Sequence, residues 1–197
     1  MLFRSPQNPK TPQMLLIILL EVMTTEVNRP SPESLKRAKA HLVRAILDDK
    51  IHVVKELLEV DYPVDLPIIE ETKQTLLMVC ASIKHSNLEI FKLILSYKPN
   101  LNLQDGAGRT ALHLACRGGR IEMVRLLIAY EELDVNVRSC GGETPLMCAA
   151  MSGNIFVVGE CLNNNFNPFL ENSLGMTASD YATYFSNVYG QNLKSVI

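Results

Sequence analysis

The sequence predicts an all-α protein, a solenoid of stacked helix-turn-helix units with hairpin fingers between them. Three observations lead to this prediction. One stretch, residues 108–128, has the pattern of a helix-turn-helix, the pattern recurs every 33 to 35 residues, and the composition, 47% hydrophobic and 20% charged, is that of a folded chain. A repeat of this period is typical of a solenoid, because each unit buries its apolar side only against its neighbours.

The stretch 108–128 contains two short helical patterns separated by a turn. Residues 110–115 read Thr-Ala-Leu-His-Leu-Ala and begin the first helix, two glycines form the turn, and residues 121–128 have the apolar spacing of a second, amphipathic helix. Thr110 stands where a hydroxyl can accept a hydrogen bond from the free backbone N–H groups of a helix start. The stretch therefore predicts one complete unit.

The same pattern occurs in five units. Thr144 follows Thr110 by 34 residues, and Thr177 follows Thr144 by 33. Thr75 precedes Thr110 by 35 residues. A divergent copy of the repeat, which lacks the threonine, occupies residues 40–58. The first unit is predicted to cap the stack, because one side of a terminal unit meets water. The last unit loses its apolar spacing after its first helix and is predicted to form a polar cap at the other end.

Residues 110–115 and the stretch 142–150, Gly-Glu-Thr-Pro-Leu-Met-Cys-Ala-Ala, resemble the T-P-L-H-x-A opening of an ankyrin repeat, and the period agrees with the ~33 residues of that family. The resemblance covers most of the chain. It implies an inner helix, a turn, an outer helix and a hairpin finger in each unit, with no catalytic group. It also implies that Thr110 and Thr144 cap inner helices and that His113 hydrogen-bonds to the neighbouring repeat.

The chain divides into three parts. Residues 1–33 form a flexible, proline-containing segment with a short apolar run at 14–20, residues 34–193 form the repeat domain, and residues 194–197 form a C-terminal tail. The seven apolar residues of the run are too few to cross a membrane core that needs ~20. Prolines before the run and Glu21 at its end disfavour a signal peptide. A short helix docked on the first repeat or a mobile partner-binding segment is favoured, and three Ser/Thr-Pro pairs are candidate phosphorylation sites.

The connections between units depart from the regular pattern in two ways. The loop 61–73 is long and contains prolines, and it is predicted to form an enlarged hairpin finger. At the end of each outer helix the family usually has a left-handed glycine, and this chain has Asp61, Lys98, Glu132 and Asn165 there instead. Because lysine and glutamate tolerate that conformation poorly, altered bends are expected near Lys98 and Glu132.

Charge, motifs and cysteines argue against several classes of function. A formal net charge of −2 gives no general attraction to nucleic acid or acidic lipid, so no nucleic-acid or membrane partner is expected. The sequence contains none of the common enzyme signatures, and His41, His52 and His85 share no metal-ligand spacing, so no enzyme activity, cofactor or metal is expected. Five cysteines, four of them in predicted helices, indicate reduced core thiols of an intracellular protein, cytoplasmic or nuclear.

The resemblance to ankyrin repeats places a partner-binding surface on the finger tips and on the exposed side of the inner helices. Arginine, methionine and tyrosine at these positions are residue types enriched in protein interfaces. The implied partner-binding residues are Arg109, Arg117, Arg120, Cys140, Glu143, Met151, Ser152, Met176 and Tyr184.

The expected function is that of a monomeric, non-enzymatic protein-protein interaction module, an adaptor or regulator that presents a preorganised surface. Three alternatives remain open. One is a transcription-factor inhibitor or co-regulator similar to inhibitor-of-NF-kappa-B proteins, although their D-S-G-x-x-S degradation motif is absent. The second is a secreted or membrane-attached effector addressed by the apolar run 14–20. The third is nucleic-acid binding through the arginines of the third unit, which would weaken steeply with salt.

Overall fold

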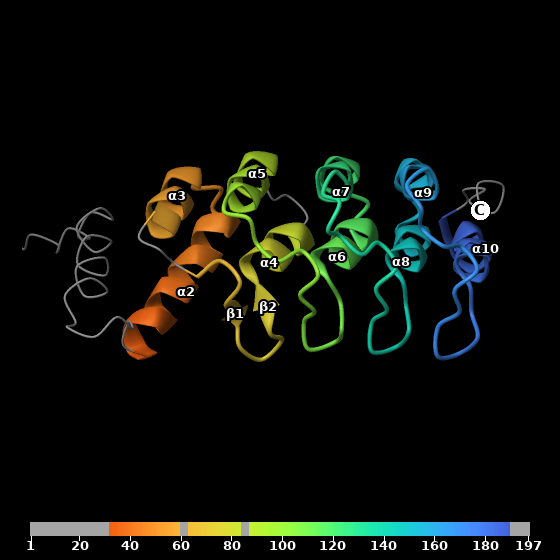
Figure 1. Ribbon diagram of the computed structural model, residues 1–197, viewed down its shortest axis with the longest axis horizontal. Helices are drawn as coiled ribbons and strands as arrows, with labels where there is room; N and C mark the ends of the chain where they lie inside the picture. Colours follow the sequence, from red (N-terminus) through yellow and green to blue (C-terminus); the bar gives the residue numbers. More distant parts are fainter. Residues whose placement is uncertain (1–31, 60–62, 84–86, 190–197) are drawn as a thin grey trace, which may run out of the picture.

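Helix pairs stacked along one axis make up the protein (Figure 1). The computed structural model describes residues 32–59, 63–83 and 87–189. The inner row consists of α2 (Pro32–Leu47), α4 (Leu76–Ser82), α6 (Ala111–Arg117), α8 (Pro145–Ser152) and α10 (Ala178–Tyr189). The outer row consists of α3 (Ile51–Glu59), α5 (Leu88–Ser96), α7 (Ile121–Ile128) and α9 (Ile155–Leu162). The fingers project from the inner row, on the side away from the outer row. This is the helical solenoid that the repeat pattern predicts.

Three inner helices begin at the threonines of the repeat pattern. The hydroxyl oxygens of Thr75, Thr110 and Thr144 accept hydrogen bonds from the backbone N–H three residues later, at 3.5, 3.4 and 3.3 Å. In α6 the residue at that position returns the contact, because His113 Nδ1 accepts from the Thr110 N–H at 3.1 Å, and methionine sulfurs do the same in α4 and α8. Each such cap stabilises a helix by about 1 kcal/mol, and the predicted capping by Thr110 and Thr144 is confirmed.

Left-handed residues reverse the chain between the inner and outer helices. Asp49, Gly119 and Gly153 have φ of 58, 68 and 73°, a region that glycine enters without steric cost. Asn87 and Asn154 then cap α5 and α9, because their side-chain oxygens accept backbone N–H groups at 2.8 and 3.0 Å. The turns after α2, α6 and α8, which the structure describes in full, are therefore short and closed by hydrogen bonds.

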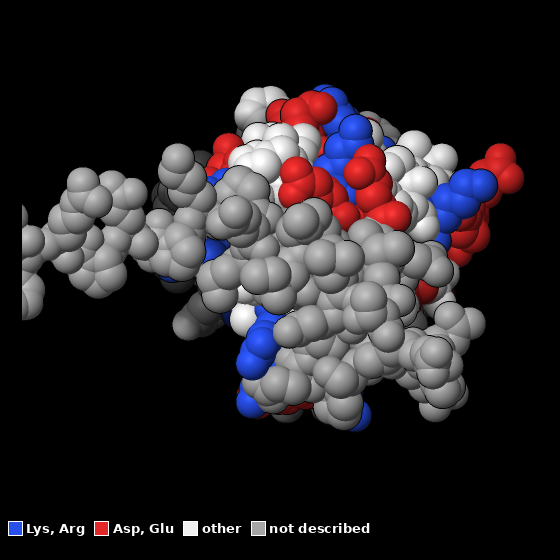
Figure 2. All heavy atoms as spheres, turned by 90° about the vertical axis from the view of Figure 1, so that its left-hand side faces the viewer, with Lys and Arg blue, Asp and Glu red and all other residues white. Residues whose placement is uncertain are grey.

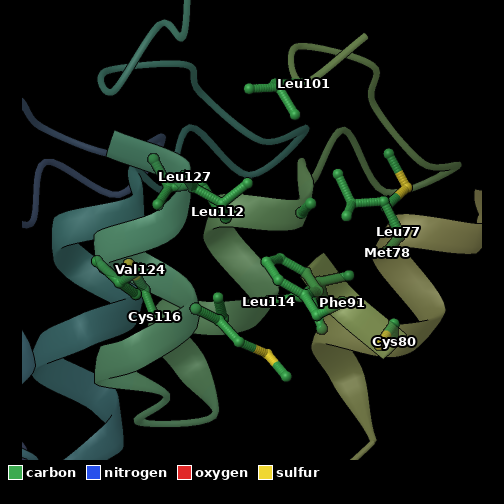
Figure 3. Packing of buried hydrophobic residues seen from close by; sticks show 14 of the residues in the cluster. Leu77, Met78, Cys80, Phe91, Leu101, Leu112, Leu114, Cys116, Val124 and Leu127 are labelled. Carbon is green, nitrogen blue, oxygen red and sulfur yellow. The ribbon is translucent and has the colours of Figure 1, made fainter. Parts of the chain in front are cut away.

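One apolar core runs between the two rows of helices. Each outer helix buries the side that faces the inner row; in α3 these residues are Val53, Val54, Leu57 and Leu58. Phe91 of α5 is fully buried, and Figure 3 shows it among side chains of α4 and α6. Burial of one large apolar side chain contributes roughly 1.5–3 kcal/mol, so this continuous core is the main stabilising feature of the stack.

The fingers contain the only β-structure of the described residues. Successive fingers are joined by backbone hydrogen bonds. The first finger has two short antiparallel strands, β1 (Pro67–Ile69) and β2 (Gln74–Thr75), which confirms the enlarged hairpin expected at 61–73. Along the tips, the N–H groups of Gly106, Cys140 and Ser173 each donate to a carbonyl of the preceding finger, at 2.7, 2.9 and 2.9 Å. This ladder fixes the spacing of the fingers.

The end of the stack at α2 and α3 has mixed charge. Figure 2 views the molecule from this end, and Lys/Arg and Asp/Glu side chains lie next to one another in the upper part of the view. Ion pairs join Arg44 to Asp48 at 2.9 Å and Lys55 to Glu59 at 3.7 Å. Opposite charges that alternate in this way create no strong field of one sign.

Several features differ from the expectations. Lys98 adopts the left-handed conformation with φ 52°, so the altered bend expected there is wrong, whereas Glu132 is not among the left-handed residues of the described chain. Helix α2 begins at Pro32, inside the segment 1–33 that the sequence assigns to the flexible N-terminus, and α10 extends through Tyr189. The apolar run, two of the Ser/Thr-Pro pairs and the serine of the third, Asp61, His85 and the C-terminal tail lie outside the described residues.

Candidate partner-binding surface

The finger of the third unit is shaped by one buried carboxylate. Asp105 Oδ1 accepts hydrogen bonds from the backbone N–H groups of Ala107 and Arg109, both at 2.9 Å. Its Oδ2 accepts from Nε and Nη2 of the Arg109 side chain at 3.0 and 2.7 Å. Burial acts to raise the pKa of Asp105, but these hydrogen bonds hold the pKa below its ordinary value. The carboxylate stays charged, and Arg109 braces the finger.

The next two fingers use neutral side chains for the same purpose. In the fourth unit Ser139 Oγ accepts from the N–H groups two and four residues later, at 3.3 and 3.1 Å. In the fifth unit Asn172 Oδ1 accepts from the two equivalent N–H groups at 2.9 and 3.0 Å. Each finger tip is therefore a hydrogen-bonded turn whose conformation exists before any partner arrives.

His113 and Glu143 connect neighbouring units. The buried His113 ring uses both nitrogens: Nδ1 accepts from Thr110, and Nε2 donates to the Glu143 carbonyl at 3.1 Å. Burial lowers the pKa of His113, so the ring is neutral and its expected inter-repeat hydrogen bond is confirmed. The Glu143 carboxylate accepts from the hydroxyl of Tyr181 in α10 at 3.2 Å. Both residues hold the fourth unit in place between its neighbours.

Arg120 also makes a structural contact. Its guanidinium donates to the backbone carbonyl of Ile83, which ties the turn after α6 to the end of α4. The side chain is half-buried, and burial lowers the pKa of Arg120. Arg109, Arg120 and Glu143, three of the residues expected to bind a partner, thus have contacts within the chain.

The other expected residues lie on the finger tips and at the ends of inner helices. Arg117 is exposed at the end of α6, and Cys140 is exposed on the fourth finger. Tyr184 in α10 is 63% exposed. The half-buried residues of this group are Met151, Ser152 and Met176. All six of these side chains are at least partly exposed.

Three large apolar side chains of the described residues are at least 70% exposed. Leu174 on the fifth finger is 80% exposed, Phe156 in α9 is 70% exposed and Phe169 after α9 is 84% exposed. A signal for two of them exists in the sequence, because Phe156 and Phe169 stand where the preceding unit has Glu122 and Asn136. Aromatic residues at repeat positions that are elsewhere polar point to an additional exposed surface.

Comparison with protein families agrees with this geometry. A family model described as three copies of ankyrin repeats matches residues 42–139, and a single ankyrin-repeat model matches residues 141–170. The chain belongs to the ankyrin-repeat family. Ankyrin repeats form protein-protein interaction modules, and proteins of this family are typically non-enzymatic.

Relatives of this ankyrin-repeat chain come from very different organisms. Human ankyrin repeat domain-containing protein 63 is 32% identical over 62% of this chain and 30% of its own length. A putative ankyrin repeat-containing protein of Treponema pallidum is 25% identical over 75% of this chain and 48% of its own length. Neurogenic locus notch homolog protein 1 of Xenopus tropicalis is 28% identical over 60% of this chain and 5% of its own length. The chain spans less than half the length of each of these relatives.

The ankyrin-repeat core contains four buried cysteines that form no disulfide, Cys80, Cys116, Cys148 and Cys161. Burial raises the pKa of Cys116 and raises that of Cys148 to about 12, so both thiols stay protonated. The expected core position is confirmed for these four cysteines, and Cys140 is exposed. In the described part of the chain, no three His, Cys, Asp or Glu side chains gather to hold a metal ion, and no helix is long and apolar enough to cross a membrane.

Proposed function

We propose that this chain is an adaptor or regulator that holds a protein partner on one surface of the ankyrin solenoid. This surface, the finger face, consists of Arg117, Cys140, Met151, Ser152, Leu174, Met176 and Tyr184. One observation supports the proposal most. Accessible side chains of the types enriched in protein interfaces, such as arginine, methionine and tyrosine, lie on turns and helices that are already hydrogen-bonded. Because these elements are already ordered, association with a partner costs little conformational entropy.

The finger face suits a partner of mixed chemistry. Leu174 and Tyr184 offer large apolar areas, and the Tyr184 ring is held edge-on to Phe185 with centroids 5.1 Å apart. Arg117 can bind a carboxylate with two parallel hydrogen bonds. The preferred partner is therefore a peptide or protein surface with bulky apolar side chains near a carboxylate.

We also propose the cellular compartment and the oligomeric state in which the protein acts. Four buried cysteines that form no disulfide support a reducing compartment, the cytoplasm or the nucleus. The chain acts there as a monomer, with the solenoid as a rigid platform.

The test is affinity capture from cell lysate with the full chain as bait. One variant combines Arg117→Glu with Tyr184→Ala and changes the finger face. A matched control, Phe156→Glu, removes an exposed aromatic side chain and adds one negative charge on the outer row. Circular dichroism and thermal unfolding verify that all three proteins are folded alike.

The proposal predicts one or more proteins that bind wild type and the Phe156→Glu control equally and that are lost from the finger-face variant. Proteins retained equally by all three baits would contradict it, because the contact would then lie on another part of the chain. A direct titration of the identified partner should show at least a tenfold loss, about 1.4 kcal/mol, for the finger-face variant.

A further inference from the structure

Two cysteine side chains from different repeats meet in the core. Cys116 is the sixth residue of α6, the inner helix of the third unit, and Cys161 is the seventh residue of α9, the outer helix of the fourth unit. Both are completely buried, and their Sγ atoms are 3.9 Å apart. A disulfide joins two sulfurs at about 2.05 Å, so these two atoms need to approach by about 1.9 Å to form one.

The repeat pattern shows what other units have at these two positions. The sixth residue of inner helices α4 and α8 is alanine, and the seventh residue of outer helices α5 and α7 is isoleucine or leucine. All four are fully buried: Ala81, Ala150, Ile94 and Leu127. A buried cysteine by itself packs as a small apolar side chain. Here cysteine replaces both members of one contact between units, which brings two oxidisable sulfurs together.

The folded core protects the pair from oxidants. The thiolate is the reactive form of cysteine, and burial raises the pKa of Cys116 well above its ordinary value. While α9 is packed, both sulfurs are sealed from water. Oxidation therefore requires a local opening that exposes one sulfur, followed by a closure that restores the contact.

Helix α9 is the element best suited to open. Its fifth residue is Gly159, whereas the fifth residues of α5 and α7 are Lys92 and Arg125. Among the outer helices of the described chain, α9 alone contains a glycine, a residue that weakens a helix interior. Segments of low local stability open most often, so Cys161 is the member of the pair that meets solvent first.

We propose that Cys116 and Cys161 form a redox-sensitive pair, which hydrogen peroxide converts to a disulfide that locks α9 of the fourth unit to α6 of the third. The pair is reduced in the resting protein and is oxidised in molecules in which α9 opens. In a reducing compartment the disulfide persists only while the oxidant is present, so it acts as a reversible switch. The switch is independent of the finger face and of what binds there.

The reaction has two steps. In the open state the Cys161 thiolate attacks one oxygen of hydrogen peroxide, the O–O bond breaks, and a sulfenic acid and a hydroxide ion form; the hydroxide takes up the proton that the thiol released. After α9 closes, the Cys116 sulfur attacks the Cys161 sulfur, the S–O bond breaks, and the hydroxyl group leaves as water with the Cys116 proton. In total the two thiols lose two electrons and two protons, and the peroxide becomes two water molecules. A thiol reductant reverses the change by thiol-disulfide exchange.

The disulfide changes the stability of the chain more than its structure. It bridges residues 45 apart in the sequence, and a bridge of that span removes conformational freedom from the unfolded chain. We expect the oxidised protein to melt at least ~5 °C above the reduced protein. The bridge also prevents α9 from opening again.

The test uses the full chain with Cys140→Ser, the parent protein, so that the exposed thiol takes no part. The reduced protein is treated with hydrogen peroxide, remaining thiols are alkylated, and mass spectrometry of the unreduced digest identifies linked peptides. The variant Cys116→Ala removes one member of the pair and installs the residue that α4 and α8 have at this position. The matched control Cys148→Val removes another buried cysteine and installs the residue that α4 has there.

We expect one intramolecular link, between Cys116 and Cys161, in the parent protein and in the Cys148→Val control. Their melting temperature should rise by at least ~5 °C and return after addition of dithiothreitol, with neither effect in Cys116→Ala. Urea below the unfolding transition should accelerate the reaction, because it favours opening of α9.

A link between any other pair of cysteines, or no link at any peroxide dose that leaves the protein soluble, would overturn the proposal. An equal rise in melting temperature in Cys116→Ala would also overturn it. A rate that low urea does not change would refute the opening step. Peptide mapping of the parent protein decides between these outcomes even if Cys116→Ala fails to fold.

Discussion

Replacement of His113 by leucine should destabilise the solenoid and remove part of its pH dependence. The ring is fully buried and joins two units through Thr110 and Glu143. Leucine fills a similar volume but leaves the Thr110 N–H and the Glu143 carbonyl without the ring as a partner. A buried polar group without a partner costs about 1–3 kcal/mol, so the substitution should cost ~2–4 kcal/mol after the gain in apolar burial.

The pH dependence follows from the lowered pKa of His113 in the folded chain, against an ordinary value of 6.5. Above that pH the ring is neutral in both states and contributes nothing. Below it the unfolded chain binds a proton that the folded chain does not, so stability decreases as pH falls toward the folded-state pKa. The loss is at most ~1.4 kcal/mol per pH unit from this one group.

Urea unfolding of wild type and His113→Leu at pH 7.5 and 5.5 measures both effects. Wild type should lose more stability between the two pH values than the variant, by up to ~1.4 kcal/mol. Asp105 does not contribute in this window, because its pKa lies below its ordinary 3.8. Equal losses in the two proteins would refute the assignment of a depressed pKa to His113. A variant destabilised by less than ~1 kcal/mol would refute the contribution of its two hydrogen bonds.

Three further substitutions test the packing and the fingers by urea or thermal unfolding. Asp105→Ala should cost about 2–4 kcal/mol, because it leaves backbone N–H groups and Arg109 without their acceptor, and a loss below ~1 kcal/mol would contradict the bracing role. Phe91→Ala should cost about 3–5 kcal/mol through a core cavity, while Leu174→Ala at an exposed tip should stay within ~0.5 kcal/mol; similar costs would refute the burial assignment. Lys98→Gly should stabilise by roughly 0.5–1 kcal/mol, since φ at this position is 52°, and destabilisation would show that the lysine side chain contributes contacts.

The local chemistry of each unit could be predicted from the sequence. A threonine at the start of an inner helix and a glycine in the turn act through neighbouring backbone atoms, so their roles follow from residue type and spacing. Thr110, Gly119 and His113 show this, and in the structure they occupy the conformations and contacts that the pattern requires. The repeat period then determines which helices are neighbours.

Contacts between units could not be predicted in the same way. Arg120 has the appearance of a free surface arginine until the fold brings it to the carbonyl of Ile83, 37 residues away in the sequence. Lys98 adopts a left-handed conformation that lysine disfavours, because its N–H closes α5 on Leu95 at 3.0 Å. In both positions tertiary packing outweighs the preference of the isolated residue.

The exposed Phe169 lies between these two situations. Alignment of the finger bases shows from sequence alone that Phe169 replaces the asparagine of earlier units. Its exposure, however, depends on whether another outer helix packs against α9, and a residue pattern within one unit does not contain that information. Among the described residues the structure shows Phe169 to be 84% exposed.

The most direct test of the proposed binding function is hydrogen-deuterium exchange of the full chain with and without the partner that affinity capture identifies. If the finger face holds the partner, slower exchange should appear at the finger-tip amides 139–143 and 172–176 and along α10, with the outer helices α5 and α7 unchanged. Protection confined to the outer row, with unaltered exchange at the finger tips, would contradict the account.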